Sequence, residues 1–387
     1  MRWQKNIPSP NQVIVWSLMW SGAGDRSFFI SIFICLGDGD PIFSEPDQLI
    51  SADMKKMSYL LLIFFLILFN SSCSYMVKNE KHRVYSTSEY GVDKFVVVGG
   101  YNVHYVEVGE GEPVFLISGA FSTYRHWNKI IPFLSKRYRL VCIDYLGVGD
   151  SDKPRSGFKY TIEEQADLIA DMMGKLQIPK VHVVGVSYGG AIALNMGARY
   201  PERVGRIVSI EGNGINGNKH QKISYGPMAD FLRFPLIGEM AVGVIRSGLA
   251  DRFVAKSVMG KAWDNLNELE RKEVMEIVSK NNRTASRSSW FHICRTLKTS
   301  RDFTEEAKRI STPILYLYGG NSDYYEMAKG NAEFFKAYLN DAQVVRFDDG
   351  IHDLQLQKPE DVSTLVLEFL NRNGTNGRKA LNSGKEF

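Results

Sequence analysis

Cysteine is scarce in this chain, and its scarcity excludes two kinds of architecture. Only four cysteines occur among 387 residues, at positions 35, 73, 142 and 294. Such wide spacing fits neither a zinc site nor the disulfide framework of a small secreted domain. Cys142 lies in the apolar run LVCID, where a buried thiol behaves as a small hydrophobic side chain. The sequence therefore makes no case for a disulfide bridge.

Concentrated charge is also missing. The net charge is only +4, from 47 basic and 43 acidic residues, with no run of five like charges and no internal repeat. A nucleic-acid partner is therefore not expected, since such proteins carry a concentrated basic stripe. The chain lacks an H-E-x-x-H motif, and no metal or other cofactor is implied. Its 44% apolar and 23% charged residues are an ordinary globular composition.

One long apolar run is present near the front of the chain. Residues 54–73 read MKKMSYLLLIFFLILFNSSC, with two lysines, an apolar stretch and small residues before a cysteine. This is the layout of a secretory signal, with an apolar core too short to span a bilayer comfortably. The closing SSC resembles a bacterial lipobox, which implies lipidation of Cys73, although Asn70 stands where that motif prefers leucine. A plain cleaved signal or an uncleaved anchor is the alternative.

The signal predicts export to a bacterial cell envelope, with the protein anchored in the membrane and facing the periplasm or the exterior. Because a signal should begin the chain, we expect translation to start at Met54 or Met57 and residues 1–53 to be a misassigned or disordered leader. Residues 74–93 read as a tether, and residues 373–387 read as a polar tail.

From about residue 94, apolar runs alternate with amphipathic stretches. Continuous Val/Ile/Leu strands separated by helix-length segments predict a parallel sheet covered on both faces, an α/β fold. The expected strands are FVVVGG with NVHYVEVG as a hairpin, then residues 113–119, 139–145, 180–187, 203–212, 313–320 and 343–350. The expected helices are residues 161–177, with Thr161 as N-cap, 189–200, 326–338 and 359–372.

Residues 214–298 interrupt this alternation with apolar helical stretches and aromatic side chains. We expect them to form a helical cap over the carboxyl edge of the sheet, where ligand sites of open α/β sheets lie. Core packing is the expected role of most of its aromatic residues, which include Phe231, Phe234 and Trp290. Residues 94–213 and 299–372 then make up the core.

Ser187 lies in the sequence Gly185-Val186-Ser187-Tyr188-Gly189, between a predicted strand and a predicted helix. This is the G-x-S-x-G pattern in the context that it requires. A sharp strand-to-helix turn strains the serine and leaves room only for glycine two residues before and after it. The following helix points its free N–H groups at the serine, where they can stabilise negative charge. The alternative is a glycine-rich turn with a solvated hydroxyl.

A nucleophilic serine needs a base and an orienting acid, and in this architecture their chain order is serine, acid, histidine. His352, in FDDGIHD, is the one histidine that follows the later candidate acids. Asp323, in the loop GGNSD after a strand, is the favoured acid. Glu211, at the end of the strand 203–212, is its rival.

Five segments together resemble the α/β-hydrolase superfamily, in particular members with a helical cap after the sixth strand, such as esterases, C–C hydrolases and non-haem haloperoxidases. They are LISGAFSTYRHW, DYLGVGDSDKP, GVSYGG, LYGGNSD and DGIHD. That family carries His-Gly-x-Pro after its third strand, and the N–H of x serves the oxyanion hole. Here the segment is Ser118-Gly119-Ala120-Phe121. The resemblance implies that the backbone amides of Ala120 and Tyr188 form the hole.

These residues predict a serine hydrolase that cleaves a small ester through an acyl-enzyme on Ser187. A C–C bond or amide hydrolase, or an acyltransferase, with the same residues remains open. So does a member of the fold that binds a ligand without catalysis. An aspartate nucleophile, as in epoxide and haloalkane hydrolysis, is disfavoured by Ser187.

Overall fold

The computed structural model describes residues 14–20, 28–34, 90–212, 225–299, 302–339 and 341–372. The expected signal, the lipidation at Cys73 and the tail lie outside these residues. Of the expected leader, residues 14–20 and 28–34 are described. Of the expected tether, residues 90–93 are described, and a strand already begins there at Val92. The chain divides into two units, Met1–Phe65 and Leu66–Phe387. In the first, β1 (Ile14–Trp20) pairs antiparallel with β2 (Phe28–Ile34). In the parts of the chain that the structure describes, no helix has the length and hydropathy needed to cross a membrane.

The second unit is built on an eight-stranded sheet with the strand order β10-β9-β8-β7-β5-β6-β4-β3. The β3–β4 and β4–β6 pairs are antiparallel and the other pairs are parallel. The fold prediction is therefore confirmed. The strands are β3 (Val92–Val98), β4 (Tyr101–Val108), β5 (Glu112–Ile117), β6 (Tyr138–Asp144), β7 (Val181–Val186), β8 (Val204–Ile210), β9 (Ile314–Gly319) and β10 (Ala342–Phe347).

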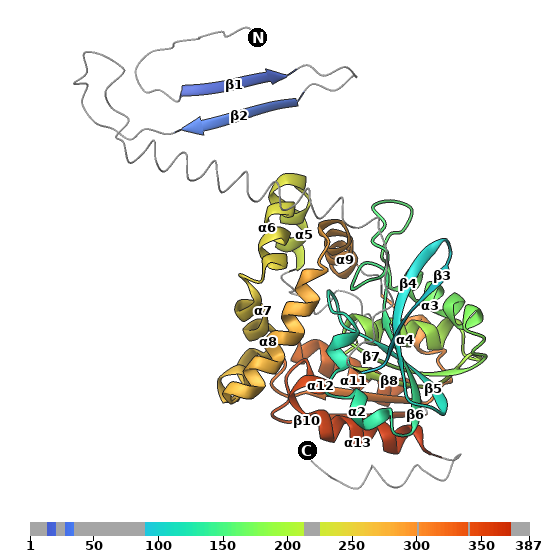
Figure 1. The fold of residues 1–387 in the computed structure, drawn as a ribbon. Helices are drawn as coiled ribbons and strands as arrows, with labels where there is room; N and C mark the ends of the chain where they lie inside the picture. Colours follow the sequence, from blue (N-terminus) through green and yellow to red (C-terminus); the bar gives the residue numbers. More distant parts are fainter. Residues whose placement is uncertain are drawn as a thin grey trace, which may run out of the picture. The chain divides into compact units, whose positions relative to one another are not determined.

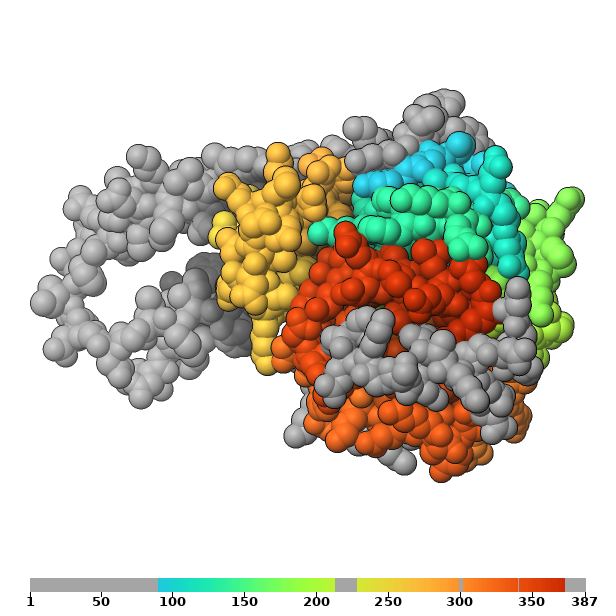
Figure 2. Space-filling model, turned by 90° about the horizontal axis from the view of Figure 1, so that it is seen from below, coloured from blue at the N-terminus to red at the C-terminus, as the bar shows by residue number. Residues whose placement is uncertain are grey.

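Helices cover both faces of this sheet, and alternate strand residues serve the two faces (Figure 1). In β5, Phe115 and Ile117 pack on one face with α3, α4 and α11, whereas Val114 and Leu116 pack on the other with α2 and α13. Figure 2 shows α13, in red, beside the green segment that carries α2. The helices are η1 (Tyr124–Trp127), α2 (Ile131–Leu134), α3 (Ile162–Lys175), α4 (Tyr188–Arg199), α10 (Thr304–Ala307), α11 (Tyr325–Tyr338), α12 (Leu354–Gln357) and α13 (Pro359–Leu370).

The start of α3 confirms a local prediction. The Thr161 hydroxyl accepts a hydrogen bond from the Glu164 amide at 3.1 Å. This bond satisfies one of the N–H groups that have no partner inside the helix.

A helical segment stands between β8 and β9, the sixth and seventh strands of the large sheet (Figure 1). Trp263 and Trp290 are buried in its two apolar clusters, as expected of core packing. Phe231 and Phe234 are not, with 47% and 57% of their surface exposed. Its helices are α5 (Tyr225–Leu232), α6 (Pro235–Ser247), α7 (Asp251–Met259), η2 (Gly260–Asn265), α8 (Glu268–Arg283) and α9 (Arg287–Thr299).

Candidate active site

Ser187 occupies a strained turn between β7 and α4. Its backbone lies at φ 54° and ψ −116°, a region that side chains with a Cβ rarely adopt. A Cβ added to Gly185 would lie 2.2 Å from the Gly189 carbonyl oxygen, and one added to Gly189 would lie 2.1 Å from the Ile117 carbonyl oxygen. Only glycine fits at both positions. Gly185 and Gly189, the two glycines of the G-x-S-x-G pattern, are therefore the residues that allow this turn.

Hydrogen bonding across the sheet places Ser187 beside Glu211. The Ser187 amide donates to the Ile210 carbonyl at 2.8 Å, and Glu211 is the next residue on that strand. Glu211 also has a positive φ, of 45°. Because β7 and β8 are parallel neighbours, the two residues lie at adjacent strand ends on one edge of the sheet.

His352 reaches this edge and meets Glu211. Its Nδ1 lies 2.5 Å from Glu211 Oε2. The same oxygen accepts from the Ser322 hydroxyl at 2.7 Å, while Oε1 accepts from the Gly319 amide at 2.8 Å. The Glu211 carboxylate is completely buried and both oxygens are engaged. Such a carboxylate can fix the orientation of the imidazole and leave Nε2 for proton transfer.

The structure reverses the ranking of the two candidate acids. Asp323, the favoured one, is exposed, and it acts on His352 only through the longer-range attraction of its charge. The hydrogen bond that it was expected to make belongs to Glu211. The reason is topological. Glu211 follows β8, which lies next to β7, whereas Asp323 lies in the turn after β9, one strand further from Ser187. Ser322, its neighbour in sequence, turns inward to the carboxylate instead.

The charges around His352 set its pKa. Burial by itself lowers the pKa of the ring, but the adjacent Glu211 carboxylate outweighs that effect, and Asp353 and Asp323 add to it. The pKa of His352 is therefore raised above its ordinary value of 6.5. A more basic imidazole is a stronger proton acceptor, provided that the pH is high enough to leave it neutral.

The two proposed oxyanion donors flank the serine. Tyr188 begins α4, so its amide is among those without a partner inside the helix. A Cβ added to Gly119 would lie 3.5 Å from the Ser187 Cβ, which places the loop of Gly119 and Ala120 against the nucleophile. Phe121 stands where the family has proline, and it adopts a φ of 66°.

His126 lies near the site, although the sequence favours a surface or packing role for it over one in lining the pocket. The ring is buried, and its Nε2 lies 3.0 Å from Asp353 Oδ1. A Cβ added to Gly119 would lie 3.7 Å from its Cε1. This His–Asp pair joins the segment after β5 to the loop that carries His352. No local pattern in the sequence predicts this pair, because His126 and Asp353 come from distant parts of the chain.

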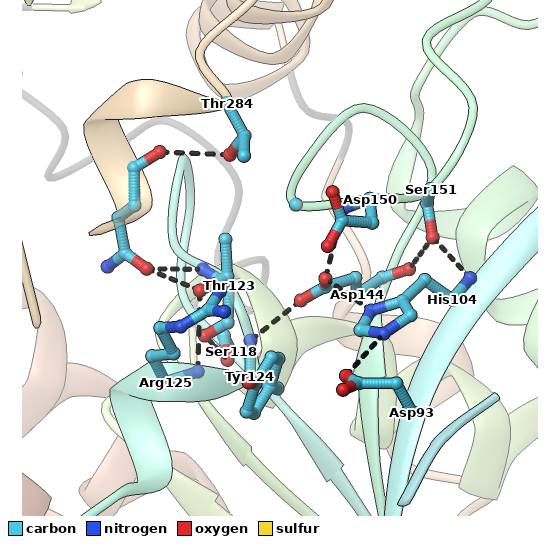
Figure 3. A network of polar contacts seen from close by, with 12 residues as sticks. Asp93, His104, Ser118, Thr123, Tyr124, Arg125, Asp144, Asp150, Ser151 and Thr284 are labelled. Carbon is cyan, nitrogen blue, oxygen red and sulfur yellow. Dashed lines mark hydrogen bonds and ion pairs between the residues drawn. The ribbon is translucent and has the colours of Figure 1, made fainter. Parts of the chain in front are cut away.

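A second buried polar network contacts Tyr124 of η1 (Figure 3). His104 contacts Asp144 at 2.8 Å through Nδ1 and Asp93 at 3.0 Å through Nε2. Asp144 also accepts from the Tyr124 amide at 2.7 Å and from the Asp150 amide at 3.2 Å. Both ring nitrogens of His104 are thus occupied by carboxylates, so this cluster ties β4, β6 and η1 together and is not proposed as a metal site.

Comparison with known families agrees with this topology. Residues 112–359 match the family described as alpha/beta hydrolase fold. The chain belongs to this family. Its sheet order, strained serine and helical segment after the sixth strand are those expected of an α/β hydrolase.

Several relatives of this α/β hydrolase are themselves named as hydrolases. 2-Hydroxy-6-oxo-6-(2'-aminophenyl)hexa-2,4-dienoic acid hydrolase of Metapseudomonas resinovorans is 25% identical over 301 residues, which cover 76% of this chain and 96% of that protein. 2-Hydroxy-6-oxo-2,4-heptadienoate hydrolase of Pseudomonas putida is 30% identical over 128 residues, 32% of this chain but only 46% of that protein. The solved meta-cleavage product hydrolase of Pseudomonas fluorescens is 25% identical with a TM-score of 0.55, covering 72% of this chain and 97% of its own.

Proposed function

We propose that the protein is a serine hydrolase that cleaves a small carboxylic ester through an acyl-enzyme on Ser187. The observation that carries the proposal is the Glu211–His352 hydrogen bond, formed at the sheet edge where Ser187 is held in its strained turn. A hydroxyl, an imidazole and a carboxylate in these places are the groups required for acyl transfer.

In the proposed reaction, His352 Nε2 accepts the hydroxyl proton as Ser187 Oγ attacks the ester carbonyl. Glu211 remains ionised and stabilises the imidazolium that forms. The amides of Ala120 and Tyr188 donate to the oxyanion, each contributing on the order of 10²–10³ in rate. His352 then protonates the leaving alcohol. A water molecule then gives a proton to His352 as it attacks the acyl carbonyl. His352 passes this proton to Ser187 Oγ as the acid leaves, which restores the serine.

The test is labelling by a fluorophosphonate together with turnover of p-nitrophenyl esters of graded acyl length. Wild-type protein should label once and hydrolyse the preferred ester, and Ser187→Ala should do neither while remaining folded. Ser151→Ala is a matched control, because Ser151 is buried but bonds the backbone of Asp144. Normal turnover by Ser187→Ala would remove the proposal.

A second candidate is hydrolysis of a C–C bond with the same residues. It is favoured by the Metapseudomonas relative, which is named as a dienoic acid hydrolase and aligns over 96% of its length. The two reactions are separated by kcat/KM for a 2-hydroxy-6-oxodienoate, followed by loss of its absorbance, against kcat/KM for the best ester. A larger value for the dienoate would favour the second candidate.

We further propose export with anchoring at Cys73, on the basis of the signal-like residues 54–73. The intact mass of the protein isolated from its native membrane decides this. A chain that begins at Cys73 and carries acyl groups is the expected result, and an unmodified chain beginning elsewhere contradicts it.

A further inference from the structure

We propose that Tyr145 is a positioning residue that sets the orientation of the Ala120 amide for the oxyanion, in place of the proline that this chain lacks. The inference rests on the proposed function. It begins from the geometry of a single peptide group, the one that joins Gly119 to Ala120.

Two hydrogen bonds fix the carbonyl end of that peptide group. The Tyr145 hydroxyl donates to the Gly119 carbonyl at 2.8 Å, and the Ser122 amide donates to the same oxygen at 3.2 Å. A peptide group is planar and trans, so its C=O and N–H point in opposite directions. Holding the Gly119 carbonyl therefore directs the Ala120 N–H to the opposite side of the group.

Tyr145 is well placed to keep this arrangement rigid. It follows β6 directly and is completely buried. Its hydroxyl also takes part in a hydrogen bond with the Phe121 backbone. Burial raises the pKa of Tyr145 far above its ordinary value, so the hydroxyl stays protonated and available as a donor at every working pH.

The same side chain also contacts the second donor residue. The rings of Tyr145 and Tyr188 lie with centroids 5.3 Å apart, and the Tyr188 amide begins α4 beside the serine. Tyr145 thus contacts the Tyr188 ring and the carbonyl of the peptide group that carries the Ala120 amide. In the family pattern a proline restricts the loop at the position held here by Phe121. Here a hydroxyl anchored in the core of the protein restricts it instead.

The test is Tyr145→Phe, which removes the hydroxyl and keeps the ring. Turnover of the preferred ester should fall about 10-fold to 100-fold in kcat, less than the loss of a whole donor, with KM changed by less than about twofold. The rate of fluorophosphonate labelling should fall in parallel, because the phosphonyl oxygen occupies the same hole. The acid limb of the pH profile should stay in place, since His352 is untouched.

Tyr160→Phe is the matched control. Tyr160 is also completely buried, and its hydroxyl also donates to a backbone carbonyl, that of Pro154, at 2.7 Å. It should lose similar stability but little kcat. A second variant, Tyr145→Met, fills the site with another apolar chain and should show the same loss of kcat if the hydroxyl is responsible.

The outcomes separate this inference from the proposed function. Labelling and turnover in Tyr145→Phe equal to those of wild type, or equal losses of kcat in Tyr145→Phe and Tyr160→Phe, overturn the role of Tyr145 and leave the serine hydrolase intact. A wild-type protein that neither labels nor turns over any ester overturns both. A loss of kcat in the Tyr145 variants but not in Tyr160→Phe supports the positioning role of Tyr145.

Discussion

His352 Nδ1 and Glu211 Oε2 lie 2.5 Å apart, although the two residues are separated by 141 positions in the chain. The carboxylate comes from the end of β8, the strand next to the one that presents Ser187. This places the orienting acid one strand closer to the nucleophile than the turn after β9 would.

The pairing predicts which carboxylate matters for turnover. Glu211→Gln should lower kcat by on the order of 10³–10⁴, because the amide no longer stabilises the imidazolium or selects the correct tautomer. Asp323→Asn, a matched loss of one exposed charge, should change kcat by less than about threefold because solvent screens it. Ester kinetics of the two variants provide the measurement. A larger loss in the Asp323 variant would restore the ranking suggested by the sequence.

The raised pKa of His352 predicts the pH dependence of the reaction. The neutral imidazole is the active form of the base, so kcat/KM should rise with pH through the pKa of His352, with a midpoint above 6.5. Asp353→Asn removes one of the charges that raise this pKa, so the acid limb of the kcat/KM profile should move to lower pH. Asp348→Asn, which alters an exposed pair with Arg346, should leave the limb in place. If the acid limb of the kcat/KM profile lies at the same pH in Asp353→Asn as in wild type, this electrostatic explanation is wrong.

The His104–Asp144 pair predicts how stability depends on pH. Burial lowers the pKa of His104, but its carboxylate partners outweigh this and raise it above 6.5, so its contribution is complete below pH 6.5 and lost as pH rises through the raised value. Burial raises the pKa of Asp144, but His104 outweighs this and lowers it below 3.8, so its contribution is complete above pH 3.8 and lost as pH falls through the lowered value. Between these two pH limits, His104→Asn should lower the free energy of unfolding by about 3–5 kcal/mol.

Urea unfolding of wild type and variant between pH 4 and pH 9 measures this difference, which should shrink at the alkaline end. His182→Asn is the contrasting control. Burial lowers the pKa of His182, so wild type should lose stability relative to that variant as pH falls below 6.5. If wild type and His104→Asn differ in unfolding free energy by the same amount from pH 4 to pH 9, packing and not ionisation accounts for the difference.

Two adjacent asparagines on α8 predict a coupling between the helical segment and the oxyanion loop. Asn281 accepts hydrogen bonds from the Thr123 amide and hydroxyl, whereas Asn282 donates to Asp251 of α7 at 2.7 Å. Both side chains are buried. Asn281→Ala should lower both stability, by about 1–3 kcal/mol, and kcat, because it frees the loop that carries Ala120.

Asn282→Ala should lower stability to a similar extent with little change in kcat, since its partner lies within the helical segment. Thermal unfolding and ester kinetics on both variants decide the matter. Equal kcat for the two variants would mean that the Thr123 contact holds the segment in place without influencing catalysis.

Much of the architecture could be predicted from local pattern. The strand that ends at Ser187, the two glycines that permit its turn and the helix behind it all follow from steric rules acting over a few residues. The alternation of apolar runs and helix-length segments likewise predicts a parallel sheet with two covered faces, because only that arrangement buries such strands.

Other features depend on which distant residues meet, and the tertiary structure alone decided them. Both Glu211 and Asp323 are candidate acids in the sequence, but the sequence favours Asp323. Which carboxylate meets His352 depends on which strands are neighbours in the sheet and on which side chains point inward. The pairing of His126 with Asp353 and the contact of Tyr145 with Gly119 have no local signature either. Short-range sterics thus determined the nucleophile and its turn, while long-range packing determined the groups that orient and assist it.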